Sequence, residues 1–145
     1  MRIGFFSWRD IIHRPANANG VIVSVRDPGA DLPNFERGWK AVHTEVFHDI
    51  DGQYGGFKTM NVRQAWRIAA FVESYAKAGI DEIAIHCHYG ESRSAAVAVV
   101  VDEHHGVKLH QAVDGANPLV LRRMRLAYAL YRILHPFTRR PQVGL

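Results

Sequence analysis

The stretch HCHYGESRS, residues 86–94, separates two apolar segments of the chain. Before it stands DEIAI, residues 81–85, which predicts a short buried strand over Ile80–Cys87. After it stands AAVAVVV, residues 95–101, which shows no alternation and predicts a largely buried helix over Ser94–His105, although its valines would also suit a strand. We therefore expect the stretch to be a turn from a strand into a helix.

A turn of this kind can bind an anion. The five residues between Cys87 and Arg93 can curl with their backbone N–H groups inward, and the N-terminus of the following helix adds positive charge. Gly90 permits a close backbone approach that a side chain would obstruct. Arg93 offers a planar fork of donors that suits two phosphate oxygens. We expect the turn to hold a phosphate group, and a free phosphate or sulfate ion would suit it as well.

Cys87, at the base of this turn, is the only cysteine in the chain. Burial as a small apolar side chain is the commoner fate of a free cysteine. Here the helix N-terminus and Arg93 would both stabilise the thiolate and make it a nucleophile at neutral pH. Attack on phosphorus would give a phosphocysteine that water hydrolyses, and no metal or other cofactor is required.

The stretch matches the signature HCxxGxxRS, and with it the chain resembles the cysteine-dependent protein tyrosine phosphatase superfamily. By its small size it is most similar to the dual-specificity-like and the prokaryotic or phage-type members. The resemblance implies that Cys87 is the nucleophile, that Ser94 helps the thiolate leave, and that His86 tunes the thiol through hydrogen bonds. It implies that the phosphate is bound by Arg93 and by the loop residues His88, Tyr89, Gly90, Glu91 and Ser92. The implied substrate is a phosphorylated protein or peptide, with phosphotyrosine favoured.

The proposed chemistry also needs an acid that protonates the leaving group, and the superfamily supplies an aspartate from a loop before the cysteine. The segment FHDIDGQYGGF, residues 47–57, offers Asp49 and Asp51. Asp49 directly follows the apolar end of a predicted strand and matches the family pattern better, so we take it as the acid and keep Asp51 as the alternative. Asp27, in RDPG, is better explained as a turn residue.

The rest of the chain predicts an α/β fold with a central, mostly parallel sheet flanked by helices, as in protein tyrosine phosphatases. Further strands are expected over residues 2–8, 19–25 and 39–48, and further helices over residues 61–78 and 118–134. With 145 residues and no low-complexity linker, we expect a single domain over residues 1–145, with a loosely held tail from Pro136 to Leu145.

Composition narrows the class of protein without choosing a ligand. The net charge of +4 favours anionic partners, among which nucleic acid is possible but not favoured. No stretch approaches the roughly 20 apolar residues that span a bilayer, and no signal peptide is recognisable, so membrane insertion is not expected. A lone cysteine survives best in a reducing compartment, which favours the cytoplasm.

Three alternatives remain open. The same mechanism could act on a phosphoinositide or on an RNA 5′-phosphate. The same cradle could also bind a phosphorylated partner without hydrolysing it efficiently. Nine histidines raise the hypothesis of a structural zinc site, with His86 and His88 beside Cys87 and with His104, His105 and His110 downstream. Of the adjacent residues 86–88 only His86 and His88 could converge, and no HExxH or paired CxxC motif is present. We therefore expect no metal.

Overall fold

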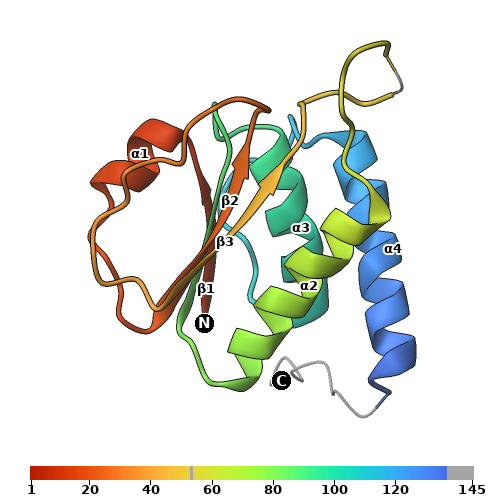
Figure 1. Cartoon of the computed structure of the whole chain (residues 1–145). Helices are drawn as coiled ribbons and strands as arrows, with labels where there is room; N and C mark the ends of the chain where they lie inside the picture. The colour runs from red at the N-terminus through yellow and green to blue at the C-terminus, as the bar shows by residue number, and fades with distance from the viewer. Residues whose placement is uncertain (53, 137–145) are drawn as a thin grey trace.

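The computed structural model describes residues 1–52 and 54–136 and has a four-stranded sheet at its centre (Figure 1). Its strands are β1 (Arg2–Phe6), β2 (Gly20–Arg26), β3 (Ala41–Val46) and β4 (Glu82–His86). They lie in the order β1-β4-β2-β3, and every neighbouring pair is parallel. The central strands β2 and β4 are buried along almost their whole length, as expected where both faces of a sheet are covered. The predicted α/β fold with a parallel sheet is confirmed.

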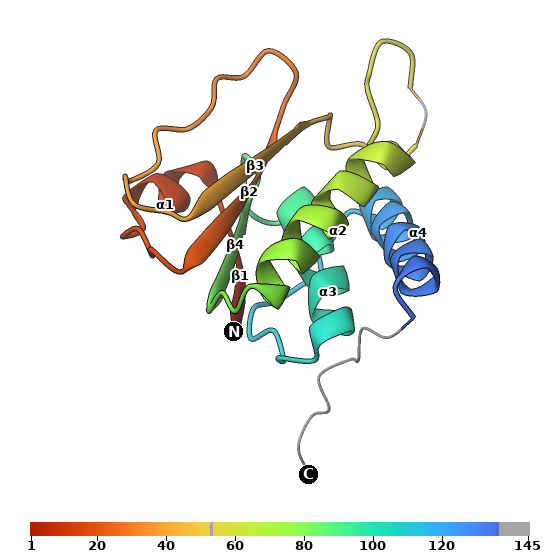
Figure 2. The same cartoon turned by 60° about the horizontal axis from the view of Figure 1, so that its bottom comes forward.

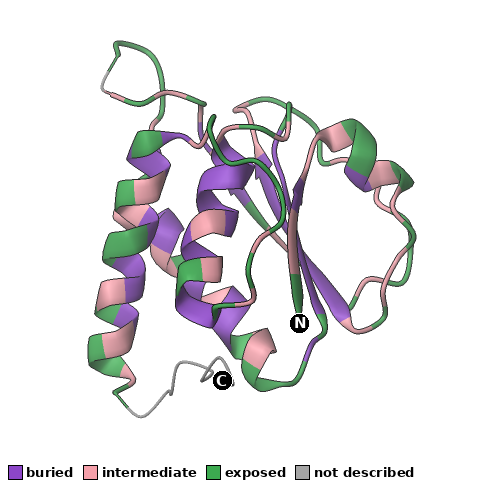
Figure 3. Ribbon diagram, turned by 180° about the vertical axis from the view of Figure 1, so that it is seen from behind, coloured by how far each residue is buried: buried purple, intermediate pink, exposed green. Residues whose placement is uncertain are grey.

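Helices cover both faces of the sheet. On one face lies α1 (Trp8–His13), and on the other lie α2 (Val62–Lys77), α3 (Arg93–His105) and α4 (Pro118–Leu134) (Figures 1 and 2). Alternate side chains of the central strands serve the two layers, so that Ile22 and Ala84 pack with Ile11 of α1, whereas Ile83 and Ile85 join the larger core. The view coloured by burial shows α3 as the innermost of these helices (Figure 3).

The first predicted strand, residues 2–8, is too long, because β1 ends at Phe6 and Trp8 opens α1. Ser7 caps this helix, its Oγ accepting a hydrogen bond from the backbone N–H of Asp10 at 3.1 Å. The pattern Ser7-x-x-Asp10 is a known helix-start signal, but a six-residue helix is too short for its periodicity to appear in the sequence. As a result, Trp8 lies beside the turn that follows β4.

The other predicted elements are found where they were expected, with small differences at their ends. The third strand is shorter than residues 39–48, and the helix predicted over residues 118–134 has those bounds. Most of the predicted loose tail, residues 137–145, lies outside the described residues. Within the described part of the chain, no helix combines the length and the apolar character needed to cross a membrane.

Because all four strands run in the same direction, their carboxyl ends gather at one edge of the sheet. There β1 and β4 are neighbours. The chain leaves β1 toward α1 on one face of the sheet and leaves β4 toward α3 on the other face (Figure 1). Ligands of open α/β sheets bind at such an edge. The stretch His86–Ser94 lies there.

Candidate active site

The loop between β4 and α3 is held tightly against the turn between β1 and α1. The backbone N–H of Cys87 donates to the Phe6 carbonyl at 3.3 Å, and that of Trp8 donates to the His88 carbonyl at 3.2 Å. Gly90 has a positive φ of 73°, and a Cβ atom there would lie 2.2 Å from the backbone nitrogen of Ser7. Only glycine fits this position, because both its backbone angle and its contact exclude a side chain.

Cys87 lies at the base of the loop and is only 2% exposed. Its sulfur accepts a hydrogen bond from the backbone N–H of Gly90 at 3.3 Å and lies 3.1 Å from Ser94 Oγ, whose hydroxyl can donate to it. Both contacts stabilise negative charge on sulfur. Ser94 is therefore placed where it can also assist a departing thiolate.

The backbone of the loop offers unused donors. Ser92 precedes α3 but its side chain makes no capping hydrogen bond, and its carbonyl accepts from Asn117 at 3.1 Å and from Ala96 at 3.0 Å. The donors without an acceptor among residues 1–52 and 54–136 include the backbone N–H groups of Tyr89, Glu91, Ser92 and Arg93. Backbone N–H groups arranged in this way at a helix N-terminus can bind an anion.

Arg93, the first residue of α3, is buried, and only part of its guanidinium group is used. Its Nη1 donates to the Phe47 carbonyl at 2.7 Å and forms an ion pair with Asp27 Oδ1 at 2.8 Å. Its Nε is buried and has no hydrogen-bond partner in the described part of the chain. A buried donor without an acceptor costs free energy. A phosphate group that accepts hydrogen bonds from Nε and Nη2 through two of its oxygens would remove this cost.

His86 is buried and neutral. Burial lowers its pKa to about 4, and the nearby positive charges of Arg93 and Arg26 act in the same direction, while a hydrogen bond to the Cys87 carbonyl opposes them. In the matching tautomer, Nδ1 donates to that carbonyl at 3.3 Å and Nε2 accepts from the Ser24 hydroxyl at 2.6 Å. The ring therefore fixes the backbone at Cys87.

Asp49, although exposed, is tied to the loop. Its Oδ1 accepts hydrogen bonds from the Ser92 hydroxyl at 2.7 Å and from Asn117 Nδ2 at 2.8 Å, and the same Asn117 caps α4. Asp51 instead accepts from the Tyr54 hydroxyl at 3.2 Å, further along the exposed segment. Of the two aspartates considered as acids, Asp49 is the one that contacts the loop.

The remaining loop side chains turn outward. His88 stacks on Trp8 with ring centroids 6.3 Å apart, and Tyr89 is 75% exposed. Glu91 is also exposed, and its carbonyl lies close to Gly115. These residues can serve a phosphate through their backbone, with their side chains left for the rim of the site.

Several residues of the site escaped the sequence analysis because they are distant in the chain. Asp27 does form the predicted turn, its carbonyl accepting from Ala30 at 3.0 Å, but its side chain also holds Arg93. Ser24 forms one hydrogen bond, to His86, whereas Asn117 donates from Nδ2 to both Asp49 Oδ1 and the Ile50 carbonyl, and no local sequence pattern predicts these contacts. For Asp27, the only signal was its place directly after a buried strand, at the edge where ligands bind.

A second cluster of polar groups lies between α2, α3 and α4. The ligand atoms of Glu73, His104 and His105 all lie within 4.8 Å of one another, close enough to hold a metal ion. In this structure Glu73 accepts from both histidines, at 3.0 and 2.7 Å, and from the Tyr128 hydroxyl at 3.1 Å. The hydrogen bonds alone account for this arrangement.

Comparison with known proteins supports the fold. The chain resembles the crystal structure of a human tyrosine phosphatase-like serine/threonine/tyrosine-interacting protein, with a TM-score of 0.51 and 19% identity over 77% of each chain. No protein-family model and no curated protein sequence matches the chain. The fold is therefore that of a protein tyrosine phosphatase-like protein, as the sequence predicted.

Proposed function

We propose that this chain hydrolyses phosphomonoesters through a phosphocysteine intermediate, with phosphorylated proteins as its substrates and phosphotyrosine foremost among them. The observation that carries the proposal is the unused edge of Arg93: among residues 1–52 and 54–136 its buried Nε has no acceptor, and neither have the nearby backbone N–H groups of Tyr89, Glu91 and Ser92. Below them lies the Cys87 sulfur, which accepts a hydrogen bond from the Gly90 N–H and contacts Ser94 Oγ. Donors and nucleophile thus converge on the space that a phosphate group would fill.

In the first step, the Cys87 thiolate attacks phosphorus, and the bond from phosphorus to the ester oxygen breaks. The loop N–H groups and Arg93 hold the three non-bridging oxygens as charge redistributes among them. Gly90 and Ser94 stabilise the thiolate before attack. The neutral ring of His86 keeps its hydrogen bond to the Cys87 carbonyl and takes no part in proton transfer.

The departing oxygen needs a proton, and Asp49 supplies it. Its Oδ1 is held by Ser92 and Asn117, so Oδ2 is the atom available for the transfer. In the second step the Asp49 carboxylate takes a proton from water, the water oxygen bonds to phosphorus, and the Cys87 thiolate leaves with the help of Ser94. Phosphate is then released and the thiolate is restored.

The charges near the loop favour a phosphoprotein over a polyanionic substrate. The carboxylates of Asp27, Asp49 and Glu91 belong to the loop or to the segments that contact it, and Asp31 lies close by. By contrast, Arg122, Arg125 and Arg132 are on α4. An RNA end or a multiply phosphorylated inositol lipid would bring further negative charge against these carboxylates.

The direct test is hydrolysis of para-nitrophenyl phosphate by the purified, reduced protein, with and without chelator. Wild type should turn over in both conditions, and Cys87→Ser should lose at least about 10⁴-fold. Turnover that survives in Cys87→Ser, or that disappears with chelator, contradicts the mechanism.

Two further variants separate the acids. Asp49→Asn should lower kcat by about 10²-fold or more, whereas Asp51→Asn should stay near wild type. The opposite result moves the acid to Asp51.

The structural neighbour is described as phosphatase-like and interacting, so binding without turnover is the rival function. A wild type that binds phosphotyrosine peptides tightly but hydrolyses neither them nor para-nitrophenyl phosphate would establish it.

A further inference from the structure

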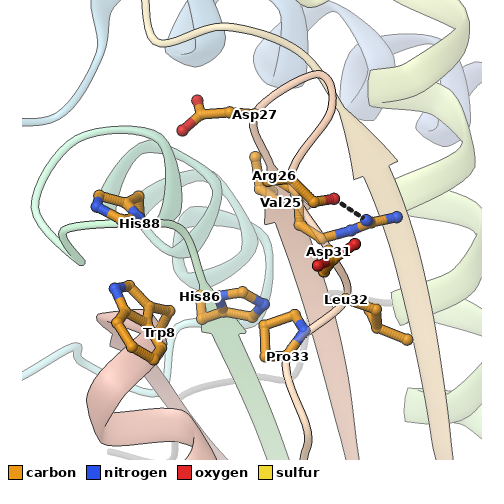
Figure 4. A pocket seen from close by; sticks show the side chains of 10 residues that line it. Trp8, Val25, Arg26, Asp27, Asp31, Leu32, Pro33, His86 and His88 are labelled. Carbon is orange, nitrogen blue, oxygen red and sulfur yellow. Dashed lines mark hydrogen bonds between the residues drawn. The ribbon is translucent and has the colours of Figure 1, made fainter.

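Figure 4 shows a cavity of about 250 Å³ beside the phosphate loop, where His86 projects from β4 between Trp8 and Pro33. Among the arginine and aspartate side chains that line it, Asp27 pairs with Arg93, and the other two carry opposite charges. The charges in this cavity are therefore balanced and select no ligand. A larger hollow elsewhere on the molecule differs in this respect.

This second hollow is a groove of about 400 Å³ between α2 and α4. It is lined by Val62, Arg63, Trp66 and Arg67 of α2 and by Leu130 and Leu134 of α4. None of these residues belongs to the candidate active site. A ligand in the groove would therefore bind without using Cys87 or Arg93.

The α4 side of the groove is part of a stripe of exposed leucines. Leu126, Leu130 and Leu134 are 45, 39 and 64% exposed, and their four-residue spacing places them along one face of the helix. The opposite side of α4, with Met124 and Tyr128, is the one that packs in the core. Exposed apolar side chains that line up in this way mark an interaction surface.

The two helices that form the groove carry positive charge. α4 has four arginines and no acidic residue, and α2 adds Arg63 and Arg67 at the groove. Two of these six arginines have an ion-pair partner among residues 1–52 and 54–136, since Arg67 pairs with Glu45 and Arg125 with Glu103. The one acidic residue on the two helices is buried and bonded to histidines. The uncompensated charge favours an anionic partner.

We propose that this groove binds an acidic amphipathic helix of a partner protein. Apolar side chains of such a helix would pack on Trp66, Leu130 and Leu134, and its carboxylates would lie beside Arg63. Helices that bind in grooves present apolar side chains three and four residues apart, which matches the spacing of the leucines on α4. The inference concerns a surface outside the proposed reaction and does not depend on it.

Two occupants from this chain fit the charge less well. Residues 137–145, which follow the described part of α4 and its cap, include Arg139 and Arg140 and no acidic residue. A second copy of the chain, packed groove against groove, would bring Arg63 toward like charge. Both would add positive charge to a positive surface, so a separate acidic partner is favoured.

The test measures binding of synthetic peptides to the full chain by fluorescence anisotropy. The first peptide is a labelled helix of about 18 residues, or five turns, with leucines on one face and glutamates on the other. A second peptide carries lysine in place of every glutamate, and a third has the sequence of the first in scrambled order. The acidic helix should bind at least roughly tenfold more tightly than either of the others. Equal affinity for the three peptides, or no saturable binding of the first, overturns the proposal.

Variants locate the binding surface. Arg63→Glu and Leu130→Gln should each weaken binding of the acidic helix by roughly fivefold or more. Arg37→Glu is the matched control for charge, because Arg37 is exposed but does not line the groove. Val42→Gln is the control for apolar surface, because Val42 on β3 is 40% exposed, close to the 39% of Leu130. Urea denaturation of each variant confirms that it is folded. Controls that weaken binding as much as the groove variants overturn the proposal.

Three further outcomes would assign the groove to another occupant and overturn the proposal. Deletion of residues 137–145 that raises the affinity for the acidic helix more than roughly tenfold would show that this segment occupies the groove. Self-association in light scattering that Leu130→Gln abolishes would show a second copy there. Binding to vesicles that contain phosphatidylserine, abolished by Leu130→Gln and without binding of the acidic helix, would assign the surface to a membrane.

Discussion

Cys87 with Arg93 at the ends of the loop, and the cluster around Glu73, are both buried groups of ionisable residues, but their hydrogen-bonding groups are satisfied to different degrees. Glu73 accepts three hydrogen bonds from protein side chains, and within the described residues only Nδ1 of His104 is left over in that cluster. In the loop, Arg93 uses Nη1, and its buried Nε has no partner in the described part of the chain. The cluster thus leaves a single histidine nitrogen unpaired, whereas the loop leaves a charged donor and several backbone N–H groups unpaired.

This difference shows how to tell a stabilising cluster from a binding site when both contain histidines and acids. Hydrogen bonds among the members of a cluster make it part of the packing between helices, here α2, α3 and α4. Unpaired donors that converge on one point leave a free-energy cost that an anion can remove. Substitutions in the loop should therefore change ligand binding, and substitutions in the cluster should change stability.

Among substitutions that separate the loop from the cluster, Arg93→Lys should have the largest effect. Lysine keeps the charge but cannot present the Nε and Nη2 edge to two phosphate oxygens. We expect kcat/KM for para-nitrophenyl phosphate to fall by roughly 10²–10³-fold. Near wild-type kcat/KM would show that a point charge is enough. Arg125→Lys is the control, because Arg125 pairs with Glu103 on the exposed side of α4, and it should change neither activity nor stability appreciably.

The loop could be predicted from the sequence because its parts are contiguous in residues 86–94, where spacing alone implies geometry. The same holds for the helix that Asn117 caps before Pro118. The residues that contact the loop could not be predicted from the sequence, because Asp27 and Ser24 reach it only after β2 has paired with β4. In the cluster, the sequence indicates the adjacent His104 and His105 but not Glu73, which stands on a different helix and is connected to them by no local pattern.

Glu73→Gln should give the largest change in stability. Burial alone would raise the pKa of Glu73, but hydrogen bonds from His104 and His105 outweigh it and lower the pKa to about 2. Removing this carboxylate should lower the free energy of unfolding by about 3 kcal/mol at pH 7, measured by urea denaturation. The KM for para-nitrophenyl phosphate should not change, and a rise in KM would mean that the cluster and the loop are coupled. Loss of stability on adding chelator to wild type would show instead that the cluster binds a metal.

As pH falls, His86 and Glu73 should lose their contributions to the free energy of unfolding in different pH ranges. A group whose pKa is lower in the folded state stabilises the protein above its unfolded pKa and loses this contribution as pH falls toward the folded value. For His86 the window runs from about 6.5 down to about 4, and for Glu73 from about 4.5 down to about 2. Wild type should therefore lose about 2 kcal/mol through His86 between pH 7 and pH 5. His86→Gln should show a smaller loss over that range, while Glu73→Gln keeps it. Equal slopes for wild type and His86→Gln would contradict a buried, neutral His86.

The smallest effect is expected at Asp27, whose side chain is 43% exposed. Its bond to Nη1 fixes the guanidinium so that the other edge faces the loop, yet its charge also competes with phosphate for Arg93. Two substitutions separate these roles. Asp27→Asn keeps an acceptor oxygen, whereas Asp27→Ala keeps neither acceptor nor charge. If Asp27 is a positioning residue, Asp27→Ala should raise the KM for para-nitrophenyl phosphate by roughly fivefold with little change in kcat, and Asp27→Asn should restore most of it. If instead both variants lower KM alike, the carboxylate acts as a competing anion, and the orientation of Arg93 depends on the Phe47 carbonyl alone.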